Sequence, residues 1–78
     1  MKVVEHERVI KYLDSRGLND QYRKVKQLIS GGLFRSVKLK KRKPTSANIW
    51  YFRINRQYRA FCTKKDDVLI VFEIDDHQ

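Results

Sequence analysis

Residues 49–55 (IWYFRIN), 58–63 (YRAFCT) and 68–74 (VLIVFEI) decide the fold of this chain. Aromatic and β-branched residues dominate all three segments, which is typical of β-strands. Only Arg56 and Gln57 separate the first two segments, and this pair contains no glycine, so we expect a turn longer than two residues. Segment 68–74 is apolar on both faces, which predicts a strand in the interior of the sheet.

The stretch before these segments changes from helical to strand-like periodicity. Val37 and Leu39 alternate with polar residues over positions 36–40, which predicts a strand with one solvent-facing side. Residues 41–48 (KRKPTSAN) follow as a basic loop broken by a proline. Residues 2–5 (KVVE) fit a short opening strand.

Two short amphipathic helices are expected between the opening strand and the glycines at 31 and 32. Apolar residues at helical spacing around Val9 and Leu13 predict the first helix, and Gly17 is placed to end it. Asn19 is a suitable N-cap for the second helix, in which apolar residues recur at three- and four-residue steps. Each helix needs another surface on which to bury its apolar side.

The element order is therefore strand, two helices and then three or four strands. A chain of 78 residues forms one domain, with a core near the lower limit for independent stability. The 41% hydrophobic and 12% aromatic content excludes a disordered basic tail. We expect a single α+β domain over residues 1–78, with two N-terminal helices packed on a small antiparallel β-sheet of three to four strands.

Charge is segregated along the sequence. Residues 31–65 contain eleven Lys and Arg and no Asp or Glu, whereas residues 66–78 contain five acids and no base. Residues 1–30 contain seven bases and four acids, and the whole chain carries a net charge of +9. A fold that gathers the basic middle onto one surface would present a strong positive field to a polyanion. Nucleic acid is thus the first partner to consider.

The densest basic run is residues 38–43 (KLKKRK), with Arg35 shortly before it. Such a run alone is most simply a solvated loop, but Arg53, Arg56 and Arg59 follow on the adjoining hairpin. We therefore expect these bases to converge on one face of the sheet. A charge inside an apolar strand is costly unless it pairs with the acidic tail or faces a phosphate at a reaction centre. Guanidinium groups bind phosphate through paired hydrogen bonds, whereas lysine acts more as a point charge.

Aromatic residues interleave with these arginines, as in surfaces on which nucleic-acid bases stack. Strand alternation sends about half of them inward. Core packing is favoured for Trp50 and Phe52, and both interpretations stay open for Tyr51 and Tyr58.

The histidine and cysteine content limits the kinds of reaction and cofactor that the chain could use. His77 is the histidine nearest the basic cluster and could act as general acid or base near neutral pH. No spacing of His, Cys, Asp or Glu suggests a metal site and no Gly-rich phosphate loop occurs, so we expect neither metal nor cofactor. The single cysteine, Cys62, fits a reducing compartment and a core position. No apolar run or signal pattern predicts a membrane span or export, which favours a soluble cytoplasmic protein.

The chain resembles the RelE/ParE superfamily of bacterial toxins, and its second half is closest to the YoeB-like branch. The residues that carry the resemblance are 49–59 (IWYFRINRQYR), 66–71 (DDVLIV) and the closing His77. In that branch a tryptophan leads into an arginine-bearing strand, a second arginine follows across a turn, and an acidic turn precedes the final strand and a terminal His-Tyr. The opening strand, the two helices and the loop before Trp50 keep the same order.

The resemblance implies the toxin of a type II toxin–antitoxin system, a ribosome-dependent endoribonuclease that cuts mRNA without a metal. Carried over by position, Arg59 would stabilise the transition state, His77 would be the general acid and Arg53 would support the site. Lys41 lies in the region where RelE-like members use basic residues for catalysis and for contacts with ribosomal RNA. Together with the charge pattern, this gives the expected nucleic-acid-binding residues Arg35, Lys38, Lys40, Arg42, Lys43 and Arg56.

Two departures from the YoeB-like pattern keep alternatives open. That branch has a glutamate base several residues before the tryptophan, where this chain has no acid, and Gln78 replaces its final tyrosine. A lysine would then have to be the general base. The alternatives are a ParE-like inhibitor of DNA gyrase without nuclease activity, or a basic RNA-binding toxin homologue that has lost cleavage.

The expected partners follow from the same resemblance and from the charge. The substrate would be mRNA on the ribosome, and an acidic antitoxin protein would cover the helices and the basic cleft. No membrane partner and no small-molecule cofactor are expected.

Overall fold

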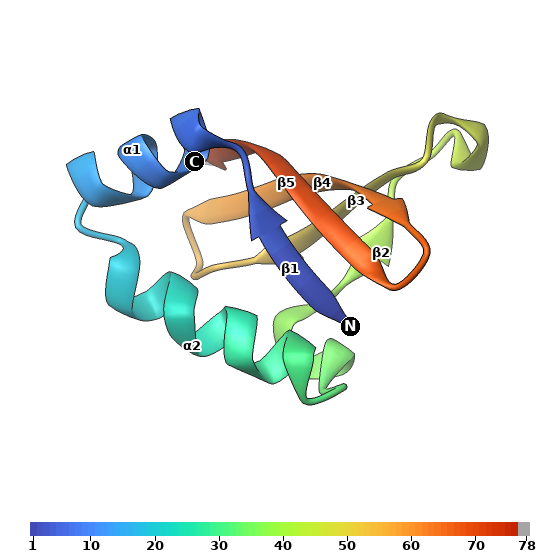
Figure 1. The fold of residues 1–78 in the computed structure, drawn as a ribbon, viewed down its shortest axis with the longest axis horizontal. Coiled ribbons are helices and arrows are strands. Elements are labelled where there is room, and N and C mark those ends of the chain that lie inside the picture. Colours follow the sequence, from blue (N-terminus) through green and yellow to red (C-terminus); the bar gives the residue numbers. More distant parts are fainter. Residues whose placement is uncertain (77–78) are drawn as a thin grey trace.

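The computed structural model describes residues 1–76 and consists of two helices that cover one face of a β-sheet (Figure 1). His77 and Gln78 lie outside the described residues. Two short 3₁₀ segments, η1 and η2, interrupt the connections before and after the second strand. In chain order the elements are β1 (Lys2–Glu5), α1 (Glu7–Ser15), α2 (Asn19–Ser30), η1 (Phe34–Val37), β2 (Lys40–Lys41), η2 (Thr45–Ala47), β3 (Ile49–Arg53), β4 (Tyr58–Lys65) and β5 (Val68–Asp76).

The sheet has five strands in the order β1-β5-β4-β3-β2. The pairs β2–β3, β3–β4 and β4–β5 are antiparallel, whereas β1 pairs in parallel with β5. The expected α+β layout is therefore confirmed, but the expectation of a purely antiparallel sheet of three to four strands is wrong. The N-terminal strand joins the free edge of the last strand, and periodicity within a four-residue strand carries no signal about its partner. As expected for segment 68–74, β5 is hydrogen-bonded on both edges.

Alternation along β3 separates the two faces of the sheet. Phe52 is fully buried under the helices, and the ring of Tyr22 from α2 lies 6.3 Å from its ring. The flanking residues Tyr51 and Arg53 point to the opposite side, and Trp50 on the core side is only partly buried. We call the side of the sheet away from the helices the outer face.

Alternation continues on β4, where Ala60 and Cys62 are fully buried in the core. Arg59 and Phe61 therefore lie on the outer face. The pairing of β4 with β5 is irregular at one point, because Phe61 faces Glu73 whereas Cys62 faces Val71. This β-bulge leaves Phe72 as the extra residue and changes which residues of β5 point outward.

The core lies between this sheet and the apolar sides of the helices. Val9 and Leu13 of α1 and Val25 and Ile29 of α2 are buried, and Tyr58, which was open between two interpretations, is buried as well. Leu and Ile side chains of this kind each contribute about 1.5–3 kcal/mol when they are fully buried. No helix within residues 1–76 is long and apolar enough to cross a membrane.

Both helices end in a glycine with positive φ. Gly17 has φ 65°, and the amide of Leu18 donates to the carbonyl of Leu13 at 2.9 Å, which is a Schellman motif. Gly17 thus ends α1 as expected. Asn19, expected as the N-cap of α2, is instead its first helical residue, since Leu18 holds the cap position. The side chain of Asn19 donates back to Asp14 at 3.1 Å.

The strand expected at positions 36–40 is mostly absent. Val37 is buried, but it belongs to the 3₁₀ segment η1, and Lys38 adopts a left-handed conformation with φ 54°. Only Lys40 and Lys41 pair with β3. The alternation of apolar and basic residues reflects one buried anchor in a turn, which period-two counting cannot distinguish from a strand.

The turn between β3 and β4 is longer than two residues, as expected. The side-chain oxygen of Asn55 accepts hydrogen bonds from the amides of Gln57 and Tyr58, each at 2.8 Å. This Asx turn replaces the glycine that a tighter hairpin would require.

The buried thiol of Cys62 predicts a pH dependence of stability. Burial raises the pKa of Cys62 to about 12, whereas a thiol in an unfolded chain ionises near ~8.5. The folded state therefore keeps a proton that the unfolded state loses, and this contribution to stability is present below pH ~8.5 and is lost as pH rises towards 12. In urea unfolding at pH 8–11, Cys62→Ala should show a shallower decline of the unfolding free energy than the parent. Burial also raises the pKa of Tyr22, but that group is the same in both proteins. Equal slopes would contradict the prediction.

Candidate nucleic-acid interface

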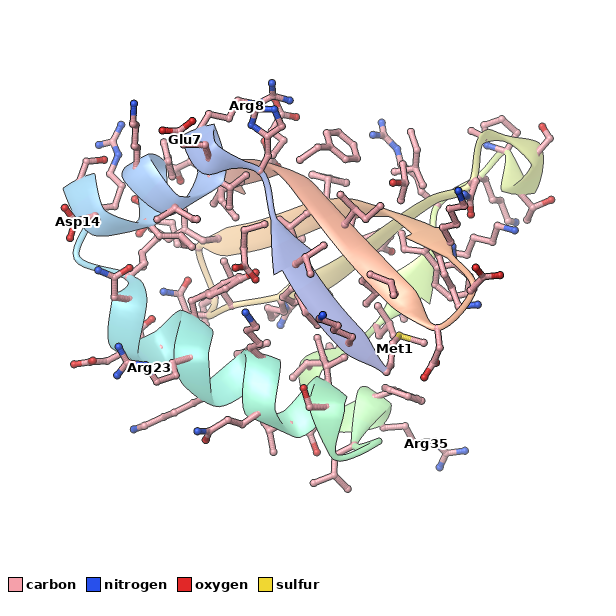
Figure 2. All side chains as sticks on the ribbon, viewed as in Figure 1. Met1, Glu7, Arg8, Asp14, Arg23 and Arg35 are labelled. Carbon is pink, nitrogen blue, oxygen red and sulfur yellow. The ribbon has the colours of Figure 1, made fainter. Side chains whose placement is uncertain are left out.

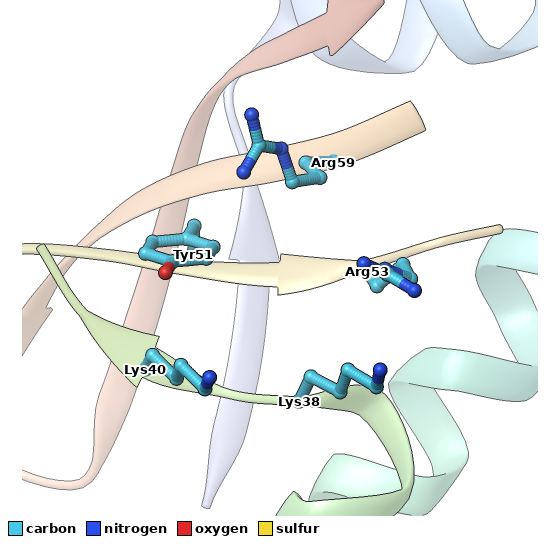
Figure 3. Close-up of a pocket in the computed structure, with 5 residues that line it drawn as sticks. All are labelled: Lys38, Lys40, Tyr51, Arg53 and Arg59. Atoms are coloured by element: carbon cyan, nitrogen blue, oxygen red, sulfur yellow. The ribbon is translucent and has the colours of Figure 1, made fainter. Parts of the chain in front are cut away.

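Four cationic side chains and one tyrosine line a small pocket on the outer face (Figure 3). Its volume is about 100 Å³, which is the share of about three water molecules in liquid water and suits a phosphate group. No carboxylate among residues 1–76 lines it. We call it the cationic pocket, and its lining residues are Lys38, Lys40, Tyr51, Arg53 and Arg59.

Three neighbouring backbone segments position these side chains. Lys38 follows η1 in its left-handed conformation, and Lys40 on β2 pairs directly with Tyr51 on β3. Arg53 on β3 pairs directly with Arg59 on β4. Because directly paired residues point to the same side of a sheet, the register alone brings the two arginines together.

The electrostatics of this arrangement favour an anion. Like charges directly opposite each other on two strands destabilise a sheet, and here two arginines stand in that relation. Within residues 1–76, the buried Nε of Arg59 has no hydrogen-bond partner. An unsatisfied buried donor costs roughly 1–3 kcal/mol, and a change of the Arg59 rotamer that brings its Nε to a phosphate oxygen would remove that penalty. The pocket is thus prepared for a ligand with acceptor oxygens and negative charge.

A second, wider pocket adjoins the first. It has a volume of about 340 Å³ and shares Tyr51 and Arg59 with the cationic pocket. We call it the aromatic pocket, and its lining residues are Arg42, Tyr51, Arg59, Phe61, Glu73 and Asp75.

Two aromatic rings, tilted at 46° to each other, and two guanidinium groups form the floor of the aromatic pocket. The rings of Tyr51 and Phe61 lie 5.9 Å apart, and the guanidinium carbon of Arg59 lies 5.5 and 5.9 Å from their centres. The guanidinium carbon of Arg42 lies 5.4 Å from the centre of Phe61. The strand β5 supplies the acidic edge, where Asp75 lies 3.8 Å from Arg59. An ion pair with the acidic tail, one of the two alternatives for an arginine within an apolar strand, is therefore present at Arg59.

The other expected site residues are distributed as follows. Lys41 pairs with Trp50 on the core side of the sheet, and its Nζ lies 5.6 Å from the indole ring, so it faces away from Arg59. Three further bases are exposed but line neither pocket: Arg35 in η1 (Figure 2), Lys43 in the loop after β2, and Arg56 in the β3–β4 turn. His77, the expected general acid, lies outside the described residues.

Sequence reasoning did not select the carboxylates at the edge of the aromatic pocket. Glu73 pairs with Phe61 and Asp75 pairs with Arg59 on the neighbouring strand. Strict alternation of 68–74 would have placed residue 73 on the same side as buried residues 69 and 71. The bulge reverses this alternation, and the sequence gives no sign of the bulge. Among residues 1–76, no group of three or more His, Cys, Asp and Glu side chains is arranged to hold a metal ion.

Comparison with known proteins adds no assignment. No protein-family model matches this chain, and a search of curated proteins gives no significant match.

The cationic pocket predicts binding of inorganic phosphate. A ligand that binds only the folded state stabilises it, and 10 mM phosphate with a dissociation constant near ~2 mM would contribute about 1 kcal/mol, or ~4–8 °C in Tm for a domain of this size. The comparison is made at constant ionic strength against sodium chloride. Arg59→Ala should lose most of the shift. Arg23→Ala, which removes the same charge from an exposed position on α2, should keep it. Equal shifts in both variants would contradict a site at Arg59.

Proposed function

We propose that this chain is the toxin of a type II toxin–antitoxin system and cuts mRNA on the ribosome without a metal ion. The observation that carries the proposal is the convergence of four cations on one pocket. Among residues 1–76, no carboxylate lines this pocket and the Nε of Arg59 has no hydrogen-bond partner. The resemblance of residues 49–59 to the YoeB-like branch also assigns Arg53 and Arg59 to the reaction centre. Both arguments point to RNA phosphate as the ligand.

The reaction needs no atom from outside the RNA and the protein. The 2′-hydroxyl oxygen of one nucleotide attacks the phosphorus of the adjacent phosphate, and the bond to the 5′-oxygen of the next nucleotide breaks. The products are a 2′,3′-cyclic phosphate and a 5′-hydroxyl end. One proton leaves the 2′-hydroxyl and one proton reaches the departing 5′-oxygen.

Arg59 would stabilise the transition state. A pentavalent phosphorane carries more negative charge on its equatorial oxygens than the starting diester, and a fixed guanidinium lowers that barrier electrostatically. Its side chain is 27% exposed, so water screens the interaction less than at a surface arginine. Lys38, Lys40 and Arg53 would hold the same phosphate and its neighbours.

Asp75 is the described carboxylate that can take the proton from the 2′-hydroxyl. It lies 3.8 Å from Arg59, so a nucleotide whose phosphate contacts that guanidinium brings its ribose close to the carboxylate. Asp75 thus offers the carboxylate that the stretch before Trp50 lacks, and it replaces the lysine expected from sequence as our choice of base. Protonation of the leaving oxygen remains the proposed role of His77.

The basic outer face also supports the proposed partners. Ribosomal RNA phosphates would contact the exposed bases around the pocket, including Lys43 and Arg56. An acidic antitoxin would neutralise the same face and block RNA access, with an affinity that falls as salt rises.

Removal of the Arg59 guanidinium should abolish most of the activity. Loss of one transition-state donor typically lowers a rate by about 10²–10³, so Arg59→Ala should reduce mRNA cleavage by that factor, measured by primer extension on a translated message with purified ribosomes. Arg23→Ala is the matched control and should cleave like the parent. If the parent shows no cleavage but inhibits supercoiling by DNA gyrase, the alternative function is correct.

Asp75→Asn separates a general base from a mere counter-ion of Arg59. General base catalysis contributes about 10²–10⁴ in rate, so cleavage should fall by at least about 100-fold. RNA binding should be unchanged or tighter, because the substitution removes a negative charge beside the phosphate site. Cleavage and affinity are measured on the same RNA. Faster cleavage by Asp75→Asn would show that the carboxylate only weakens Arg59.

A further inference from the structure

We infer that the aromatic pocket binds the base of the attacking nucleotide and selects guanine, so that cleavage follows a guanosine. This inference rests on the proposed function, since it takes the cationic pocket as the place of the scissile phosphate. It goes further by assigning a base preference and the residues that produce it.

The position of Asp75 determines which nucleotide would occupy the aromatic pocket. The two pockets share Tyr51 and Arg59, so they are contiguous. Asp75, the proposed acceptor of the 2′-hydroxyl proton, lines only the aromatic pocket. The ribose beside Asp75 belongs to the nucleotide on the 5′ side of the scissile phosphate. Its base therefore points into the aromatic pocket.

The floor of the aromatic pocket offers surfaces on which this base would lie. Bases of single-stranded RNA stack on aromatic rings and on guanidinium planes, and this pocket offers both. Phe61 is flanked by two guanidinium groups, at 5.4 Å (Arg42) and 5.9 Å (Arg59). The volume of about 340 Å³ lies at the lower end of the roughly 300–1,000 Å³ found for small-molecule sites.

The edge of the base would face the carboxylate of Glu73. Glu73 pairs directly with Phe61 across β4 and β5, so its exposed carboxylate lies beside the ring on the same face. No ion pair or hydrogen bond within residues 1–76 engages this carboxylate. An ionised carboxylate accepts hydrogen bonds and donates none. It therefore favours a base edge that presents donors.

Guanine is the base whose edges match both ends of the pocket. Its Watson–Crick edge presents two adjacent donors, N1–H and the N2 amine, which one carboxylate can accept together. Its other edge presents O6 and N7, the acceptor pair that an arginine such as Arg42 binds. Adenine and cytosine offer one donor beside an acceptor. Uracil offers one donor between two acceptors, which a carboxylate repels.

Binding to short RNAs tests the base preference without cleavage. The probes are fluorescently labelled UUXUU pentamers in which X is G, A, C, U or inosine and carries a 2′-deoxyribose, so the attacking hydroxyl is absent. Fluorescence anisotropy with the full chain at low salt should give about tenfold tighter binding for G than for A or U. Inosine lacks the N2 amine and should lie between G and A.

Two variants assign the preference to Glu73. Glu73→Gln replaces one acceptor oxygen by a donor and should bring the ratio of G to A affinity within about twofold. Asp66→Asn makes the same charge change at an exposed turn residue with φ 54°, a conformation that asparagine tolerates, and should keep the parent ratio. Equal affinities of the parent for all pentamers, or an unchanged ratio in Glu73→Gln, would overturn the inference.

Cleavage mapping on a ribosome-bound message separates this inference from the proposed function. Cuts after guanosine in the parent, and cuts without base preference in Glu73→Gln, support both. Cuts spread over all four bases in the parent overturn guanine selection and leave the nuclease intact. A preserved guanine preference in binding with no cleavage overturns the nuclease and leaves the base site intact. No binding to any pentamer overturns both.

Discussion

The direct pairing of Arg53 with Arg59 across two adjacent strands is the constraint on which the interpretation of this protein depends. A sheet gains stability from attractive or apolar pairs at such positions, and two guanidinium groups there oppose it. The core face of the same strands compensates, because Phe52, Ala60 and Cys62 are fully buried. Stability is thus supplied on one side of the sheet and given up on the other, which is common where a surface is shaped for a ligand.

The order of the strands places the basic middle of the sequence beside its acidic end on the outer face of the sheet. The acidic strand β5 lies between β1 and β4, so Glu73 and Asp75 come to stand beside the cationic strands. Asp75 partly neutralises Arg59 from 3.8 Å, while no acid within the described part of the chain lines the cationic pocket. A ligand that spans the boundary needs an anionic group at one end and hydrogen-bond donors at the other. A nucleotide has this pattern.

Sequence patterns were sufficient for the helix-on-sheet layout, since the helices, the glycine at 17 and strands β3 to β5 follow from local periodicity. Lys38, Lys40, Arg53 and Arg59 belong to a larger set of bases that was expected to converge, and the sequence did not separate these four from the rest. The parallel pairing of β1 was missed because it depends on a contact between the two ends of the chain. Lys41 was grouped with its neighbours by sequence proximity, although one residue along a strand changes the face.

The β-bulge at Phe61 and Cys62 lets one continuous strand follow two opposite patterns. Before Phe72, odd-numbered positions Leu69 and Val71 face the core, and after it the odd-numbered Glu73 and Asp75 face outward. The single extra residue therefore reverses which positions of the strand face the core. If β5 kept Phe72 but alternated strictly, without the bulge, Glu73 and Asp75 would point toward the helices. The residues that face outward on β5 therefore depend on the position of the bulge as well as on residue type.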